Sequence, residues 1–176
     1  MMKIIRVLCF LFLAAIPGCG EDGPRTRQRQ KQVQANGEIV QRYVNEILNQ
    51  GKLSVADEII GEDFVDPAGA PGEKGPESLK KVITSFRTIF PDLSVTIDEM
   101  VVDGESIAWK WTATGTHQAA MFGIPPTGKQ VTFGGIIIDT IQNGKIVERQ
   151  GIWDRMGLKE QLLEHRTYHS NRGGLP

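Results

Sequence analysis

The chain has 176 residues, 40% of them hydrophobic, and a formal net charge of −1. Residues 32–176 carry 14 Lys and Arg against 19 Asp and Glu, so this part of the chain is mildly acidic. Nucleic-acid binding requires a basic surface that neutralises phosphates, and we therefore expect no nucleic-acid partner. The length fits one domain with a sizeable core.

The first residues have the pattern of an export signal. Lys3 and Arg6 precede a short apolar run, 7–16, which is too short to be kept as a membrane span. The residues Ile-Pro-Gly-Cys that follow resemble a bacterial lipobox ending at Cys19. We predict a signal peptide over 1–18 and a lipid on Cys19 that anchors the exported protein to a membrane of the cell envelope. A plain signal peptide and a cytosolic chain with an unusual start are the alternatives.

Residues 19–35 predict a flexible polar spacer between the anchor and the domain. By resemblance to bacterial lipoproteins, Gly20 is not the Asp that favours inner-membrane retention, so we expect the periplasmic side of the outer membrane in a cell with two membranes. The alternative for the spacer is a basic arm that touches anionic lipid, formed by Arg25, Arg27, Arg29 and Lys31. The two cysteines, Cys9 and Cys19, both lie in the export segment, which leaves the domain without a disulfide or a thiol nucleophile.

The first half of the domain has helical patterns. Apolar residues recur at helical spacing over 39–48, and Ser54 is placed to cap a short second helix over 55–60. A Gly- and Pro-rich loop over 68–75 leads to a third helix over 76–90, whose first turn suits Pro76.

The second half alternates with period two. Asp103-Gly104 predicts a hairpin, followed by a strand with Ile107, Trp109, Trp111 and Ala113 on one face. A long strand over 131–141 contains Gly134-Gly135, which indicates a bulge or a close approach. Asn143-Gly144 turns it into a partner strand over 145–154, and 157–164 predicts a closing helix.

Helices followed by an antiparallel sheet predict an α+β fold. The stretch Trp-Lys-Trp-Thr-Ala-Thr-Gly-Thr over 109–116, His117, the loop 123–129, Asn-Gly-Lys-Ile-Val-Glu over 143–148 and Trp-Asp-Arg over 153–155 together resemble the SnoaL-like polyketide cyclases of the nuclear transport factor 2-like superfamily.

This resemblance implies a cone of three N-terminal helices packed on a curled antiparallel sheet, with a short C-terminal helix. We place the domain at 36–166, with a frayed tail over 167–176. The resemblance also implies a pocket for a small apolar or aromatic carbonyl compound, and a homodimer that forms through the sheet.

Asp154 is the first candidate for catalysis. In the family a carboxylate just before the Gly-Leu helix, here Gly157-Leu158, faces the pocket and acts as general acid/base, and an apolar pocket raises the pKa of such a group. By simple alternation Asp154 shares a face with Ile146, Glu148, Gln150 and Ile152. The alternative is that Asp154 pairs with Arg155 or caps the following helix.

His117 falls on the same face as Trp109 and Trp111. The resemblance gives it a place at the pocket rim, where it would orient or protonate an enolate oxygen; the alternative is a structural His at a strand end. The candidate ligand-binding residues are Trp109, Trp111, Phe133, Met121 and Gln150, and for the tryptophans the alternative is the core.

No cofactor is expected, because the substrate carbonyl itself stabilises the carbanion. No metal site is expected either: His165 and His169 have helical metal-ligand spacing, but no third ligand lies near them in the sequence.

The chain departs from the family pattern at Pro67, where many members have His, and at Arg149-Gln150, where many have His-Trp in a Glu-His-Trp triplet. Two hypotheses follow. The first is an acid–base enzyme that cyclises, isomerises or hydrolyses a carbonyl compound. The second is a non-catalytic binding or interaction module of the cell envelope, with an orphan scaffold as a further possibility.

Overall fold

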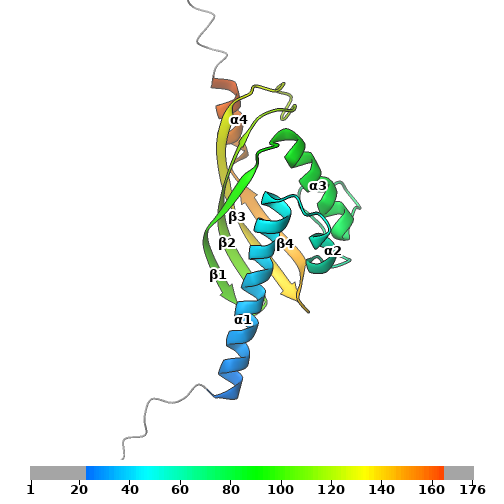
Figure 1. Ribbon diagram of the computed structural model, residues 1–176, viewed down its shortest axis with the longest axis vertical. Helices are drawn as coiled ribbons and strands as arrows, with labels where there is room; N and C mark the ends of the chain where they lie inside the picture. Colours follow the sequence, from blue (N-terminus) through cyan, green and yellow to red (C-terminus); the bar gives the residue numbers. More distant parts are fainter. Residues whose placement is uncertain (1–22, 165–176) are drawn as a thin grey trace, which may run out of the picture.

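The computed structural model describes residues 23–164. In chain order its elements are α1 (Pro24–Arg42), η1 (Tyr43–Asn49), α2 (Val55–Ile59), α3 (Gly75–Ile89), β1 (Ser94–Asp103), β2 (Ser106–Thr116), β3 (Gln130–Gln142), β4 (Lys145–Trp153) and α4 (Arg155–Leu163). The four strands pair in sequence order as one antiparallel sheet. The sheet is long and curled; α1, α2 and α3 lie along one side of it, and α4 lies at the end where β4 finishes (Figure 1). This layout confirms the predicted α+β architecture.

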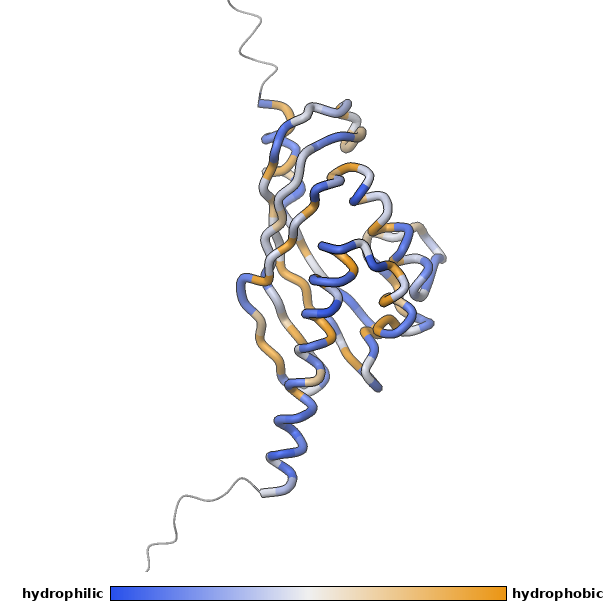
Figure 2. Tube along the Cα trace, in the orientation of Figure 1, coloured by the Kyte–Doolittle hydropathy of each residue, from blue (hydrophilic) through white to orange (hydrophobic). Residues whose placement is uncertain are grey.

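The first helix is longer than predicted. Residues 24–35, expected to be a flexible spacer, form the N-terminal part of α1, so that expectation was wrong for this part of the chain. Pro24 suits a first helical turn, and Gln, Arg and Lys are good helix formers. The first turns of this segment are mostly hydrophilic and project beyond the sheet (Figure 2). Arg29 Nη2 binds Asp103 Oδ1 at 2.6 Å, and Asn36 Nδ2 donates to the carbonyl of Gly104 at 2.8 Å; both contacts hold α1 to the first hairpin.

The other helices lie where the patterns place them. Ser54 is the residue before α2, but its side chain makes no capping hydrogen bond, which corrects the proposed cap. η1 continues α1 as a π-helix, and Asn49 near its end fixes it to β1 by two hydrogen bonds with the backbone of Val95. Within residues 23–164 no helix is both long and apolar enough to cross a bilayer.

Both predicted hairpins are present. Gly104 has φ of +62°, and Asn143 and Gly144 have φ of +51° and +76°, values that glycine and asparagine adopt more readily than other residues. The long β3 also needs its two glycines. A Cβ on Gly135 would lie 2.4 Å from the carbonyl oxygen of Ile152, and one on Gly134 would lie 2.6 Å from that of Trp111. The predicted close approach is therefore correct.

The two faces of the sheet differ. The face that the helices cover carries the buried side chains, as predicted for this alternation. They are Ile107, Trp109 and Ala113 of β2, and His117, which directly follows the strand. The pairing of β3 with β4 contains a register shift. Ile141 pairs with Ile146, but the preceding residue Thr140 pairs with Glu148, so one residue of β4 between them is unpaired. Ile146 is consequently buried, whereas Glu148, Gln150 and Ile152 are exposed on the outer face. The simple alternation predicted for this strand was wrong because of that bulge.

Candidate functional site

An ion pair lies in the interior, between the sheet and η1. Asp139 of β3 and Arg149 of β4 are direct partners in the strand register and are 0% and 7% exposed. Arg149 donates from Nε to Asp139 Oδ1 at 2.7 Å and from Nη2 to Oδ2 at 3.0 Å. Trp109 Nε1 donates to the same carboxylate at 2.9 Å, and the guanidinium lies 4.3 Å from the ring centroid of Tyr43. We call Tyr43, Trp109, Asp139 and Arg149 the ionic cluster.

The ionic cluster is electrostatically closed. Burial alone would lower the pKa of Arg149, but the Asp139 carboxylate outweighs burial and raises it above its ordinary value. Burial raises the pKa of Tyr43, which therefore stays protonated. The carboxylate of Asp139 accepts three hydrogen bonds, and the contact between Arg149 and the Tyr43 ring joins the cluster to η1. Trp109, 2% exposed, lies in the core, which is the alternative stated for it.

Further along the same face, next to the buried Phe90, lies a group of aromatic rings around Phe133. We call it the aromatic cluster, and it consists of Phe86, Trp111, Phe122, Phe133 and Trp153. Phe133 lies 6.0 Å from Trp111 and 5.9 Å from Trp153, while Phe86 and Phe122 lie 6.2 and 6.3 Å from Trp153. All but Phe133 are half-buried. Trp111 of β2 and Trp153 of β4 are both register partners of Gly135 in β3. Because Gly135 has no side chain, none separates the two tryptophans.

One polar atom in this cluster lacks a partner. Trp111 Nε1 is buried, and no acceptor binds it among residues 23–164. A buried N–H without an acceptor costs about 1–3 kcal/mol, which makes such groups rare in structural cores. Trp109 and Trp111 lie two residues apart on one face of the strand, but their indole groups differ. The N–H of Trp109 donates to the Asp139 carboxylate, whereas the N–H of Trp111 has no acceptor among the described residues.

Asp154 lies next to the aromatic cluster, directly after Trp153, but it is exposed. Its backbone N–H donates to the carbonyl of Gly134, and its Oδ1 accepts the backbone N–H of Gly157 at 2.7 Å. Asp154 is therefore the N-cap of α4, which is the alternative stated for it, and the expected apolar surroundings are not found. Its other oxygen, Oδ2, has no hydrogen-bond donor in the described part of the chain.

His117 is buried at the base of the loop 117–129. Its Nδ1 accepts the backbone N–H of Thr127 at 3.2 Å, which places the ring proton of the neutral form on Nε2. That Nε2 is buried and has no partner in the described structure. Burial lowers the pKa of His117, so the imidazole is neutral at pH 7. Phe90 covers the ring at 6.0 Å, and no hydrogen bond joins His117 to Asp154.

The other candidates are dispersed. Phe133 lies at the centre of the aromatic cluster, and Met121 is half-buried in the loop above it, where its backbone pairs with Ile124. Gln150 is exposed on the outer face and donates to Glu148 Oε1 at 3.0 Å, so its assignment to the pocket was wrong. Cys19 lies outside the described residues.

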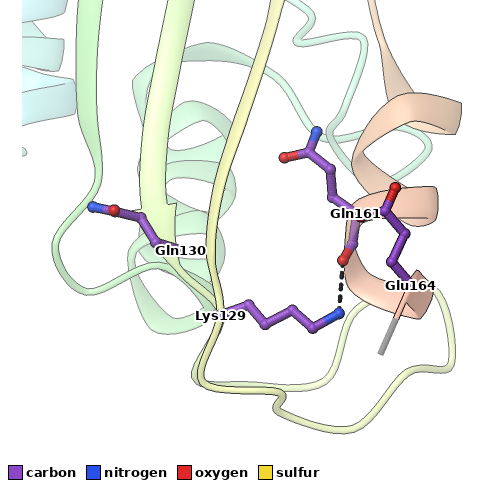
Figure 3. A pocket seen from close by; sticks show the side chains of 4 residues that line it. All are labelled: Lys129, Gln130, Gln161 and Glu164. Carbon is purple, nitrogen blue, oxygen red and sulfur yellow. Dashed lines mark hydrogen bonds between the residues drawn. The ribbon is translucent and has the colours of Figure 1, made fainter. Parts of the chain in front are cut away.

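A polar hollow of about 370 Å³ lies between the start of β3 and α4, lined by Lys129, Gln130, Gln161 and Glu164 (Figure 3). Its groups have structural roles. Lys129 Nζ donates to the carbonyls of Gln161 and Leu162 at the end of α4, and the Gln161 side chain bonds the backbone of Thr132 in both directions. This hollow carries no chemistry that we can assign.

Metal ligands do not gather in the described part of the chain: no three His, Cys, Asp or Glu side chains within residues 23–164 are placed to hold an ion. His165 and His169 lie outside that range.

A curled antiparallel sheet with helices over one face and an aromatic interior defines the cone class of the nuclear transport factor 2-like fold. Within this class, residues 38–162 match the model of the SnoaL-like polyketide cyclase family, and the chain belongs to that family.

Solved structures agree with this assignment. A candidate polyketide cyclase from Acidithiobacillus ferrooxidans is 26% identical with a TM-score of 0.66, and covers 74% of this chain and 95% of its own. TsrD from Streptomyces laurentii is 25% identical with a TM-score of 0.66, over 73% and 95% of the two chains. IdmH from Streptomyces antibioticus, a candidate polyketide cyclase, is 26% identical with a TM-score of 0.63, over 72% and 97%. The comparison with curated proteins gave no match to this chain.

Proposed function

We propose that this protein binds a small apolar carbonyl compound against the aromatic cluster and acts on it as a cofactor-independent acid–base enzyme of the cyclase or isomerase type. The observation that carries the proposal is the buried, unpartnered N–H of Trp111 among half-buried rings. A carbonyl oxygen is the acceptor that such a donor lacks, and flat rings provide the apolar walls typical of small-molecule sites. Membership of the SnoaL-like family supports the same class of ligand.

The chemistry needs one base and one oxyanion donor. Asp154, which directly follows Trp153, takes a proton from the carbon next to the carbonyl, and the electron pair moves onto the carbonyl oxygen. The Trp111 N–H stabilises the resulting enolate. The enolate carbon then attacks a second carbonyl in the same molecule and closes a ring, and Asp154 returns the proton to the new alkoxide. Return of the proton to a different carbon gives isomerisation instead.

A ketone with acidic C–H bonds tests this proposal without knowledge of the natural substrate. In D₂O, the wild-type protein should accelerate exchange of the protons next to the carbonyl of 2-tetralone, measured by ¹H NMR. Asp154→Asn should abolish the acceleration, because the amide cannot take the proton. The amide oxygen can still cap α4, so the variant should remain folded. Equal exchange rates for wild type and Asp154→Asn would remove Asp154 from the mechanism.

A non-catalytic binding module is the second candidate, and one observation favours it. Asp154 is exposed and committed to the cap of α4, and it is not held in an apolar pocket. This alternative predicts that 2-tetralone binds to wild type and to Asp154→Asn with the same affinity while neither accelerates exchange. Acceleration by the wild-type protein would exclude it.

We also propose that the protein is exported and anchored by a lipid on Cys19. The support is the sequence alone: a basic start, an apolar run and the lipobox-like residues before Cys19. Cells that express the full chain should incorporate labelled palmitate into the protein, and Cys19→Ser should lose the label. A wild-type chain that stays unlabelled and in the soluble fraction would contradict the anchor.

A homodimer through the outer face of the sheet is a further proposal. Val101, Ile136 and Ile138 are 60%, 50% and 50% exposed there, and Ile152, the register partner of Ile136, is 78% exposed. An apolar face of this kind on a sheet is typical of an interaction surface. Light scattering should give twice the chain mass for the wild type and a monomer mass for Ile138→Lys. A monomeric wild type would refute the dimer.

A further inference from the structure

The loop 117–129 places a side chain on top of the aromatic cluster. His117 N donates to Lys129 O and Gly128 N donates to His117 O, which closes the base of the loop. At its tip, Met121 and Ile124 exchange two backbone hydrogen bonds, and Phe122 between them has φ of +55°. A non-glycine residue rarely takes this conformation, and such positions concentrate at functional sites. The result is a Phe122 ring 6.3 Å from Trp153 at an interplanar angle of 28°.

Arg155 completes this arrangement from the other side. Its guanidinium carbon lies 5.6 Å from the Phe122 centroid and 5.8 Å from the Trp153 centroid. Cation–π contacts of this length orient an arginine without using its hydrogen-bond donors. Arg155 is exposed, and within residues 23–164 it forms no ion pair with a carboxylate. By contrast, the other arginine stacked on rings, Arg149, has its charge neutralised by Asp139.

We infer that Phe122, Trp153 and Arg155 form a subsite for a flat aromatic ring that carries an anionic group such as a carboxylate or a sulfonate. The two rings stack on the aromatic part, and the planar guanidinium binds the anionic group with its free donors. The inference rests on the proposed function and narrows its ligand class from any apolar carbonyl compound to an aromatic anion.

The α4 N-terminus next to this subsite is not the anion site. Asp154 already accepts the Gly157 N–H there, and a Cβ on Gly157 would lie 2.1 Å from Asp154 Oδ2, so the carboxylate fills that position. Recognition of the anionic group therefore depends on the Arg155 side chain, and the negative charge of Asp154 opposes it.

Two fluorescent dyes with the same aromatic rings, one anionic and one neutral, distinguish the contribution of the charge to binding from that of ring stacking. The probes are 8-anilinonaphthalene-1-sulfonate, which is an anion, and N-phenyl-1-naphthylamine, which is neutral. We expect Arg155→Ala to weaken sulfonate binding about fivefold, the size expected for a partly solvated charge-assisted contact, and to change the affinity for the neutral dye less than about twofold. Arg155→Lys should recover part of the loss. Lys110→Ala is the matched control, because Lys110 is an exposed cation on the outer face of the sheet.

A second variant tests the stacking. Phe122→Ala should weaken both dyes, because the ring contributes to both complexes. Unchanged sulfonate affinity in Arg155→Ala, or equal losses for the two dyes, would overturn the subsite. Failure of the proposed function is a different result: the neutral dye would not bind to the wild-type protein and exchange of 2-tetralone would not be accelerated.

Discussion

The ionic cluster and the aromatic cluster lie on the same face of one sheet, yet they differ in how their polar atoms are used. The Asp139 carboxylate accepts three hydrogen bonds and is paired with the charge of Arg149. Around Trp111 an indole N–H is buried and unpaired, and the cation nearest the rings, Arg155, has no carboxylate partner among the described residues. Satisfied polar groups hold a fold together, whereas unsatisfied ones at a half-buried surface indicate a ligand. This difference is the reason why we give the first cluster a structural role and propose the second as the binding site.

The largest effect should come from breaking the ion pair. Arg149→Met leaves the Asp139 carboxylate buried beside a single indole donor, which should lower the free energy of unfolding by about 3–5 kcal/mol. Urea denaturation followed by circular dichroism measures this change. Arg155→Met is the matched control on an exposed arginine and should cost less than about 0.5 kcal/mol. Similar losses for the two variants would contradict the structural role of the ionic cluster.

The same substitution at two tryptophans sharpens the comparison. Trp109→Phe deprives Asp139 of a hydrogen bond and should lower the free energy of unfolding by about 2 kcal/mol or more, because the acceptor is charged and buried. Trp111→Phe removes a donor that has no partner, so the removed polar group offsets much of the lost ring contact. In thermal unfolding, the midpoint temperature of Trp109→Phe should be clearly lower than that of Trp111→Phe. A reversed order would mean that the indole of Trp111 has an acceptor in solution.

The helix cap should have a smaller effect. Asp154→Ala removes the acceptor for Gly157 N–H and should cost about 1 kcal/mol, while Asp154→Asn should cost only a few tenths, because Asn caps as well as Asp. Chemical denaturation of both variants beside wild type measures this difference. A loss in Asp154→Asn as large as in Asp154→Ala would show that the charge of Asp154, and not its capping bond, stabilises the protein.

The smallest effect concerns pH. The folded state lowers the pKa of His117, so as pH falls below the ordinary value of about 6.5 the unfolded chain takes up a proton before the folded chain does. Stability should therefore be fully present above that pH and decrease between it and the lower pKa of the folded state. His117→Asn, which keeps an acceptor for Thr127 N–H, should flatten this part of the stability profile. An unchanged profile would assign the pH dependence to other groups.

The sequence was sufficient for the fold because its signals are local. Asp103-Gly104 and Asn143-Gly144 define both hairpins, and the alternation of Trp109 and Trp111 correctly identifies the covered face. The spacer prediction failed at 24–35 because its composition, rich in Gln and Arg, suits both a solvated coil and a helix extended from an adjacent stable one. The bulge beside Ile146 arises from how β3 and β4 pair, and no residue type in the sequence predicts it. The alternation was therefore continued through the bulge, which placed Gln150 on the wrong face.

The site was predicted in part. Trp111, Phe133 and Asp154 do lie in one region, but the exposure of Asp154 depends on the start of α4, which strand alternation does not describe. Asp139 and Arg149 were missed as a pair because the bulge beside Ile146 sets their register. Counting back from the Asn143-Gly144 turn without that bulge would place Asp139 opposite Glu148. The contact between Phe122 and Arg155 could not be predicted from a sequence pattern, because it joins the tip of a loop to the start of a helix.

The most direct test of the division between the two clusters is to observe the indole protons themselves. The chain has three tryptophans, and ¹⁵N-labelled protein should therefore give three indole N–H signals. Titration with 2-tetralone should move the Trp111 signal downfield as its N–H finds an acceptor, while the Trp109 signal, already bonded to Asp139, stays in place. A shift of Trp109 with none at Trp111 would contradict the assignment of binding to the aromatic cluster.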